Sequence, residues 1–313
     1  MKTIIGTYGT AIAGAAIIIF FVLFAPRFAS GPNIVNVLKD TSFLAILALG
    51  FTLALIVSEL DLSIAEVSSL SAVICGALVH GGTSPAVAVA VALLVGVAAG
   101  AFNGVGVTRL RIPSLIMTLG TAAIAKGLGF MITQGVGFVG RWPSSFTGLS
   151  RGDLGGVPYL VIWMAIAGAA AYLLVNWTRT GAHMVATGEA VEAARLAGVA
   201  TARMKLLGLT LSGGLGGVTA VLLAANLSSA APNMVGDYFL YAIAAVLLGM
   251  TMFKPGHANV LGTLYAALVL KVLGNGLVLM GAPYYWQDMI LGLIIIASVA
   301  FSASVLKKVA FTV

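Results

Sequence analysis

The chain has 313 residues, of which 60% are apolar and only 8% charged, and its mean hydropathy is +1.11. A soluble domain carries roughly a quarter charged residues, so this composition excludes an ordinary soluble protein and predicts an all-α polytopic membrane protein. The formal charge of +7 is scattered between apolar runs rather than gathered on one stripe, which argues against a nucleic-acid partner.

About ten apolar segments are candidates to cross a bilayer, which takes roughly 20 residues each. They are Tyr8–Ala25, Leu38–Val57, Val67–Val79, Pro85–Val107, Ser114–Thr133, Pro158–Trp177, Leu206–Leu227, Phe239–Phe253, Ala258–Met280 and Trp286–Val305. The third and eighth are short for a span, which favours broken or re-entrant segments there and leaves the count open by one or two. We expect one transmembrane domain over residues 1–313, in contact with membrane lipid.

The basic residues predict the orientation of these spans. If the spans alternate from a cytoplasmic N-terminus, one side receives Lys2, Arg109, Arg111, Arg179, Arg195, Arg203, Lys205, Lys254, Lys307 and Lys308. The other side receives only Arg27, Arg141, Arg151 and Lys39. Because Lys and Arg accumulate in cytoplasmic loops, both termini and the segment 178–205 are predicted to be cytoplasmic.

A polar cluster interrupts the apolar sequence between the second and third spans. It holds Ser58, Glu59, Asp61, Ser63 and Glu66. Polar groups at membrane depth are costly without a partner, so one interpretation is a break that lines a water-filled path. The other interpretation is a short surface turn with solvated carboxylates.

Small residues and amides mark places where spans are expected to meet. Gly96, Gly100 and Gly104 recur at i, i+4 and i+8, a spacing that lets helices approach closely in lipid. Asn103 and Asn275 each precede a glycine, and they are expected to cap helices or bond between them, with solute contact as the alternative.

Two lysines, Lys126 and Lys271, lie within apolar spans. A lysine in such a position commonly extends its side chain to the membrane interface. We expect the same here.

Two connections are predicted on the extracytoplasmic side, at residues 134–157 and 228–237. The first is rich in Gly, Pro, Ser and Trp, which indicates an ordered loop. Together the two form either a landing surface for a soluble partner or plain linkers.

The segment 178–205 is the longest stretch that is too rich in charged residues to lie within the bilayer. Its centre predicts a short helix between Gly188 and Gly198, the second glycine acting as a stop. Ala190, Ala193, Ala194 and Ala197 fall at i, i+3, i+4 and i+7, which predicts a flat alanine face. Glu192 and Arg195 are spaced to pair. Such a helix suits docking to a soluble protein, although an ordinary solvated connector has the same composition.

The sequence holds no motif for chemistry on this chain. There is no HExxH zinc pair and no phosphate-binding loop of the G-x-x-x-x-G-K-[ST] type, so no metal or cofactor is expected. Its one cysteine, Cys75, excludes a disulfide framework. Transport, not catalysis, is the expected function.

Three stretches resemble the permeases of sugar-type ABC importers, the family of the ribose permease. Residues 103–121, NGVGVTRLRIPSLIMTLGT, resemble the family's NG-x4-TR-x-RIPS-x3-TLGT segment, and residues 188–199, GEAVEAARLAGV, resemble its cytoplasmic coupling segment. Residues 237–279 are similar to its C-terminal part, and Asp61–Ser63 matches its IDLS turn, although Ser58 and Glu59 replace a glycine pair that usually precedes it.

The resemblance implies a bacterial inner-membrane subunit that forms a solute path and hydrolyses no ATP itself. ATP and Mg are expected on partner ATPase subunits, and a second permease, identical or different, and a periplasmic solute-binding protein complete the assembly. The implied ATPase-coupling residues are Glu189, Glu192, Ala193, Ala194, Arg195 and Gly198, and the implied path residues are Ser58, Glu59, Asp61, Asn103 and Asn275.

The implied cargo is a small polar solute, a monosaccharide or polyol. A nucleoside, an autoinducer-like sugar or a branched amino acid is the alternative cargo. The rival class is a self-contained proton-coupled carrier that uses Glu59, Asp61 or Lys271.

Overall fold

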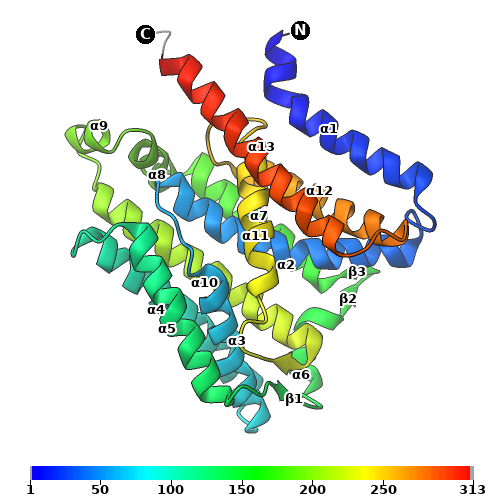
Figure 1. Ribbon diagram of the computed structural model, residues 1–313. Helices are drawn as coiled ribbons and strands as arrows, with labels where there is room; N and C mark the ends of the chain where they lie inside the picture. The colour runs from blue at the N-terminus through cyan, green and yellow to red at the C-terminus, as the bar shows by residue number, and fades with distance from the viewer. Residues whose placement is uncertain (1, 311–313) are drawn as a thin grey trace.

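The computed structural model describes the backbone of residues 2–310 and the side chains of residues 8–300, and most of this part is helical (Figure 1). The elements are α1 (Lys2–Phe24), α2 (Gly31–Ile56), α3 (Ile64–His80), α4 (Pro85–Thr108), α5 (Ser114–Thr133), β1 (Phe138–Val139), α6 (Ser144–Arg151), β2 (Asp153–Leu154), β3 (Val157–Pro158), α7 (Tyr159–Trp177), α8 (Arg179–Glu189), α9 (Val191–Leu196), α10 (Thr201–Leu227), β4 (Ser229–Ala230), α11 (Gly236–Gly249), α12 (Val260–Leu279) and α13 (Tyr285–Ala310). The strands have two residues each and form two antiparallel pairs.

Proline defines where several helices begin. Pro32 and Pro85 lie in the first turn of α2 and α4, and Pro113, Pro143 and Pro158 directly precede α5, α6 and α7. The fixed φ of proline suits a helix start, where its missing N–H has no intrahelical partner to lose. Pro32 also explains why α2 begins at Gly31, ahead of the predicted start at Leu38.

Six of the described helices are long and apolar enough to cross a membrane: α2, α4, α5, α7, α10 and α12. Four shorter apolar segments, in α1, α3, α11 and α13, cover residues 8–24, 64–80, 236–249 and 285–300. These ten elements occupy the positions of the ten predicted segments. Six is the number of spans that length and composition support in this part of the chain.

The core surrounds α2, which crosses the centre of the helical bundle (Figure 1). In its spanning window 67% of the residues are buried, against 17% in α7 at the periphery. Leu44, Ile46 and Leu47 are fully buried and pack in one cluster with residues of α11 and α12. The central helix is therefore buried on nearly all sides over residues 41–56, whereas the peripheral helices turn apolar side chains outward.

The two predicted extracytoplasmic loops are joined to each other. Strand β1 of the first loop pairs with β4 of the second, with Phe138 opposite Ala230. Behind this pair, Trp142 and Phe146 are buried against each other with ring centroids 5.5 Å apart. The loops thus form one small ordered structure at the end of the bundle remote from α8 and α9.

Both ends of the described chain lie at the top of the view in Figure 1, on the side where α8 and α9 protrude. The common cytoplasmic side for the termini and the segment 178–205 stays a prediction. The side chains of Lys2, Lys307 and Lys308, on which the predicted orientation partly depends, lie outside the described residues.

Candidate functional site

The segment 178–205 folds into two helices where the sequence predicted one. The Thr178 side chain caps α8 by accepting a hydrogen bond from the Gly181 N–H at 3.0 Å. The helix ends at Glu189, and Ala190 breaks it with φ −155° and ψ 87° before α9 begins. The short helix predicted between Gly188 and Gly198 is α9, and the preceding helix α8, with Gly188 in its last turn, was not predicted.

Gly198 ends the second helix, as its position predicted. Its φ is +82°, a left-handed conformation that glycine adopts without strain. The N–H of Gly198 donates to Arg195 O at 3.0 Å, and the N–H of Val199 donates to Ala194 O at 3.0 Å. This pair of bonds satisfies the last carbonyls of α9 in a Schellman motif.

The alanines do not form one exposed face. Ala194 is 6% exposed and turned into the protein, whereas Ala193 and Ala197 are exposed on α9 and Ala190 lies between the helices. The predicted docking face of four alanines is therefore incomplete, because Ala194 packs against the protein while the other three are exposed. Leu196, which is 87% exposed, adds the apolar part of the outward surface instead.

Glu189, Glu192 and Arg195 of this segment have ionisable partners. Arg195 Nη2 lies 2.6 Å from Glu192 Oε2 on the solvent side of α9, which is the predicted pair. Glu189 Oε1 lies 3.5 Å from Nε2 of His257, in the connection between α11 and α12.

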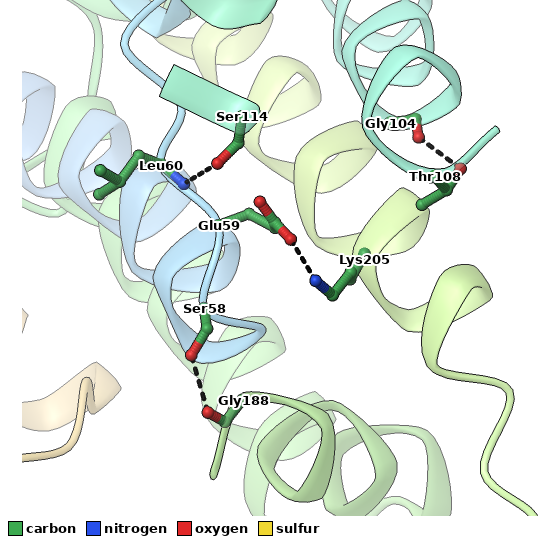
Figure 2. Close-up of polar contacts among 8 residues, drawn as sticks. All are labelled: Ser58, Glu59, Leu60, Gly104, Thr108, Ser114, Gly188 and Lys205. Carbon is green, nitrogen blue, oxygen red and sulfur yellow. Dashed lines mark hydrogen bonds and ion pairs between the residues drawn. The ribbon is translucent and has the colours of Figure 1, made fainter. Parts of the chain in front are cut away.

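The turn between α2 and α3 contacts the end of α8 directly. Ser58, with φ 57°, donates from its Oγ to the carbonyl of Gly188 at 2.7 Å (Figure 2). A Cβ on Gly188 would collide with the carbonyl oxygen of Ile56, so only glycine allows the two backbones to meet this closely.

An ion pair fixes the same turn to the first turns of α10. Glu59 Oε1 lies 2.6 Å from Lys205 Nζ, with side-chain exposures of 6% and 24% (Figure 2). On the other side of the turn, Ser114 Oγ of α5 accepts from the Leu60 N–H at 3.3 Å. The interpretation of a solvated surface turn was wrong, because Glu59 is buried and paired.

A buried hydrogen-bond chain continues inward from the turn. Asp61 is 1% exposed and accepts from Ser212 Oγ of α10 at 2.7 Å and from Ser63 Oγ at 2.6 Å. Asn103 of α4 donates to Ser63 Oγ at 2.8 Å and accepts from Thr121 Oγ1 of α5 at 2.6 Å. The chain of bonds connects the turn with three helices.

The environment of Asp61 favours its neutral form. Burial raises the pKa of this carboxyl, and the hydrogen bonds from the hydroxyls of Ser63 and Ser212 lower it in part. The pKa of Asp61 is therefore raised overall.

The structure brings four of the five predicted path residues together and leaves one apart. Ser58, Glu59, Asp61 and Asn103 lie at or beside the α2–α3 turn. Asn275 lies on α12, where it exchanges two hydrogen bonds with Asn33 of α2 at 2.9 and 3.0 Å. Residues 57–63 are not helical, so Glu59 lies in the turn whereas Glu66 lies in the first turn of α3.

The glycines of α4 lie against α10. A Cβ on Gly96 would collide with the carbonyl of Gly213, and one on Gly100 with the carbonyl of Leu209. A Cβ on Gly104 would collide with the side chain of Leu206. The two backbones are therefore in contact over several turns.

Sequence reasoning missed the partners of the turn, Lys205 and Ser212. Both lie far from residues 58–63 in the chain, and no local pattern connects them. Lys205 and Ser212 lie in the first half of α10. Their polarity alone indicates only that this part of the helix lies near one membrane face, and it does not identify their partners.

The described side chains include no group of three or more His, Cys, Asp or Glu residues placed to hold a metal ion. One G-x-S-x-G pattern does occur, at residues 148–152. Its Ser150 is fully buried within α6, not at the exposed strand-to-helix turn that a nucleophile of this type requires. The pattern therefore provides no hydrolase site.

The comparisons with known proteins agree on one family. Residues 33–299 match the family described as branched-chain amino acid transport system / permease component. The ribose import permease protein RbsC of Escherichia coli (strain K12) is 35% identical over 88% of this chain and 87% of its own length. The autoinducer 2 import system permease protein LsrC of Yersinia pseudotuberculosis is 31% identical over 92% of this chain and 84% of its own.

One solved structure, described as an inward-facing conformation of a metal-chelate type ABC transporter, also matches. It covers 97% of this chain and 99% of that chain, with 13% identity and a TM-score of 0.46. That likeness is too weak to carry an argument.

Proposed function

Since the chain belongs to the permease component family of the branched-chain amino acid transport system, and so is a transport subunit of an ABC importer, we propose that α8 and α9 couple it to an ATPase. The contact of this segment with the α2–α3 turn supports the proposal. Ser58 bonds to the last turn of α8, and Glu59 pairs with Lys205 at the start of α10. Movement of α8 and α9 therefore acts on α2, α3 and α10 through two short polar contacts.

The outward surface of α9 is suited to docking in a groove of a soluble partner. It combines the exposed Ala193 and Ala197 with Leu196 and the Glu192–Arg195 pair. Apolar residues placed on one side of a helix are the usual anchors for this kind of contact. Glu189 and Gly198 border the surface at its two ends.

The proposed assembly has two permeases, two ATPase subunits and a periplasmic solute-binding protein in the bacterial inner membrane. ATP and Mg bind the ATPases, and this chain supplies about ten spans with both termini in the cytoplasm. The structure formed by β1, β4 and α6 is the proposed landing surface for the binding protein, because it is ordered and lies at the end opposite α9.

We favour a neutral sugar or polyol as the cargo. RbsC and LsrC are named for the import of ribose and autoinducer 2, and both match most of this chain. The family description names branched-chain amino acids, which remain the second candidate. A proton-coupled carrier is less well supported, because Glu59 is held in an ion pair and Asp61 is buried behind hydrogen bonds from two serines.

Affinity purification from gently solubilised native membranes tests the assembly. We expect an ABC ATPase to co-purify with the wild-type chain, and we expect the double variant Glu192→Arg, Ala193→Arg to lose it. Asp153→Arg, an exposed charge reversal on β2 at the other end, is the control and should retain the ATPase. Retention of the ATPase by the double variant, with folding intact, would refute the coupling role of α9.

A further inference from the structure

A polar cavity lies between α2, α11, α12 and α13, apart from the α2–α3 turn. Its polar side chains come from four helices: Asp40, Tyr241, Lys271, Asn275 and Gln287. These helices meet here near the start of α2 and α13 and the end of α12, which is the end opposite α8 and α9. None of the coupling contacts involves this cavity.

The charged residues of the cavity lie deep within their helices. Asp40 follows the first residue of α2 by nine positions, and Lys271 precedes the last residue of α12 by eight. At about 1.5 Å per residue, both lie some 12 to 14 Å from the helix ends. Asp40 is exposed at this depth, and a carboxylate there is costly against lipid. This face therefore contacts water or protein rather than acyl chains.

Lys271 does not extend to the interface, contrary to the expectation from its sequence position. Its Nζ lies 4.5 Å from the ring centroid of Tyr238 and 5.3 Å from that of Tyr241. Cation–π contacts of this kind hold an ammonium in place. Asp40 and Asp237 are near enough to attract its charge, yet no carboxylate lies within 4.0 Å of it among the described side chains. The ammonium keeps donors available for a ligand.

One of the two amide groups at the cavity, that of Asn275, is held by hydrogen bonds. Asn275 is bonded to Asn33 on α2 by two reciprocal hydrogen bonds. A Cβ on Gly274 would lie 3.1 Å from Gln287 Oε1, so the glycine leaves the space that this side chain occupies. Lys271 and Asn275 are thus the polar groups of the cavity that have defined contacts.

The chemistry of the lining defines a class of ligand. The lining of the cavity contains one basic and one acidic side chain, Lys271 and Asp40, so it carries one group of each charge sign. Ammonium, amide and phenol groups donate, while carboxylate and amide oxygens accept, which matches hydroxyl groups that do both. A few polar groups beside aliphatic side chains and one aromatic ring, that of Tyr241, are typical of small-molecule sites.

We propose that this cavity binds a neutral polyhydroxylated solute, of the monosaccharide or polyol class, on its passage across the membrane. The inference rests on the proposed importer function and adds the residues that contact the cargo. Lys271 and Asp40 hold hydroxyl groups of the solute, and the ring of Tyr241 forms one wall.

Uptake measurements provide the first test. Cells carrying the complete importer are assayed for ATP-dependent uptake of radiolabelled D-ribose, D-galactose and myo-inositol, and a transported solute is then used with the variants. We expect Lys271→Met to lower the maximal uptake rate at least tenfold with ATPase co-purification unchanged. Lys39→Met, the same exchange at a neighbour of Asp40 that does not line the cavity, should stay within twofold of wild type.

The outcomes separate the two levels of the proposal. If the wild-type importer takes up none of these solutes, the sugar cargo fails and the inference fails with it. If uptake is ATP-dependent but Lys271→Met transports at the wild-type rate, the importer function stands and the cavity is not the solute site.

Thiol labelling gives a second test that does not depend on the charge substitution. The only cysteine, Cys75, is fully buried, so an introduced cysteine can be read in an otherwise native chain. We expect Gln287→Cys to react with a membrane-impermeant sulfonated thiol reagent, and the transported solute to slow the reaction at least threefold. Leu293→Cys, on the outer surface of α13 in the apolar zone, should not react. An unreactive Gln287→Cys, or a rate that the solute leaves unchanged, would overturn the inference.

Discussion

The Glu59–Lys205 pair allows the contact between the α2–α3 turn and α10 to be tested quantitatively. Its charged atoms are 2.6 Å apart, and Glu59 is only 6% exposed. With an effective dielectric of about 20, the gross attraction at this distance is about 6 kcal/mol, and desolvation offsets much of it. Lys205→Met leaves the buried carboxylate without its partner, so we expect a loss of about 3 kcal/mol, the lower end for a buried pair because Lys205 is partly exposed.

A double-mutant cycle separates the pair from its surroundings. Glu59→Gln, Lys205→Met and the double variant are unfolded at equilibrium in mixed detergent micelles, with tryptophan fluorescence as the probe. We expect a coupling energy of about 2 kcal/mol, because the double variant leaves no unpaired charge.

The Glu192–Arg195 pair is a matched control with the same N–O distance of 2.6 Å. Its side chains are 72% and 67% exposed, so its coupling should be about 0 to 1 kcal/mol. If the two pairs gave equal coupling energies, burial would not be the source of the stabilisation and the reasoning about Glu59 would be refuted.

Three further predictions concern packing and helix ends. Gly100→Leu should abolish folding and membrane accumulation because its side chain would overlap the backbone of α10, whereas Gly127→Leu, with open space around it, should accumulate as the wild type does on immunoblots. Ser212→Ala removes a donor to a buried carboxyl group and should lower the unfolding free energy by about 1 to 3 kcal/mol, while Thr210→Ala, whose hydroxyl bonds only within its own helix, should cost less. Gly198→Ala should cost about 1 kcal/mol in the same assay because its φ is +82°; no change would show that the end of α9 is not held in this conformation.

The parts of the fold that were predictable depend on neighbours in the sequence. The stop at Gly198 and the Glu192–Arg195 pair follow from contacts three or four residues apart, and both are present. The positions of the long helices were likewise predictable from the apolar segments, since length and hydropathy are local properties of the sequence. These features needed no knowledge of which helices meet.

The features that escaped prediction depend on contacts between distant segments. The sequence predicted a short helix after Gly188 but not α8 before it; α8 ends where Gly188 meets the α2–α3 turn. Ala194 looked equivalent to Ala193 and is buried only because α9 rests on the body of the protein. The burial of Glu59 similarly depends on Lys205, which no spacing rule links to it.

The glycine contact between α4 and α10 has a mechanical consequence. Where backbone touches backbone, no side chains can change rotamer to absorb a displacement, so the two helices form one stiff rod. With 27 residues, α10 is about 40 Å long, and it continues at one end from α9 and at the other into β4, which pairs with β1. A displacement at the α9 end is therefore transmitted along α10 to the opposite surface of the protein without loss to side-chain repacking. The hinges of any motion must then lie in the helices around α4 and α10.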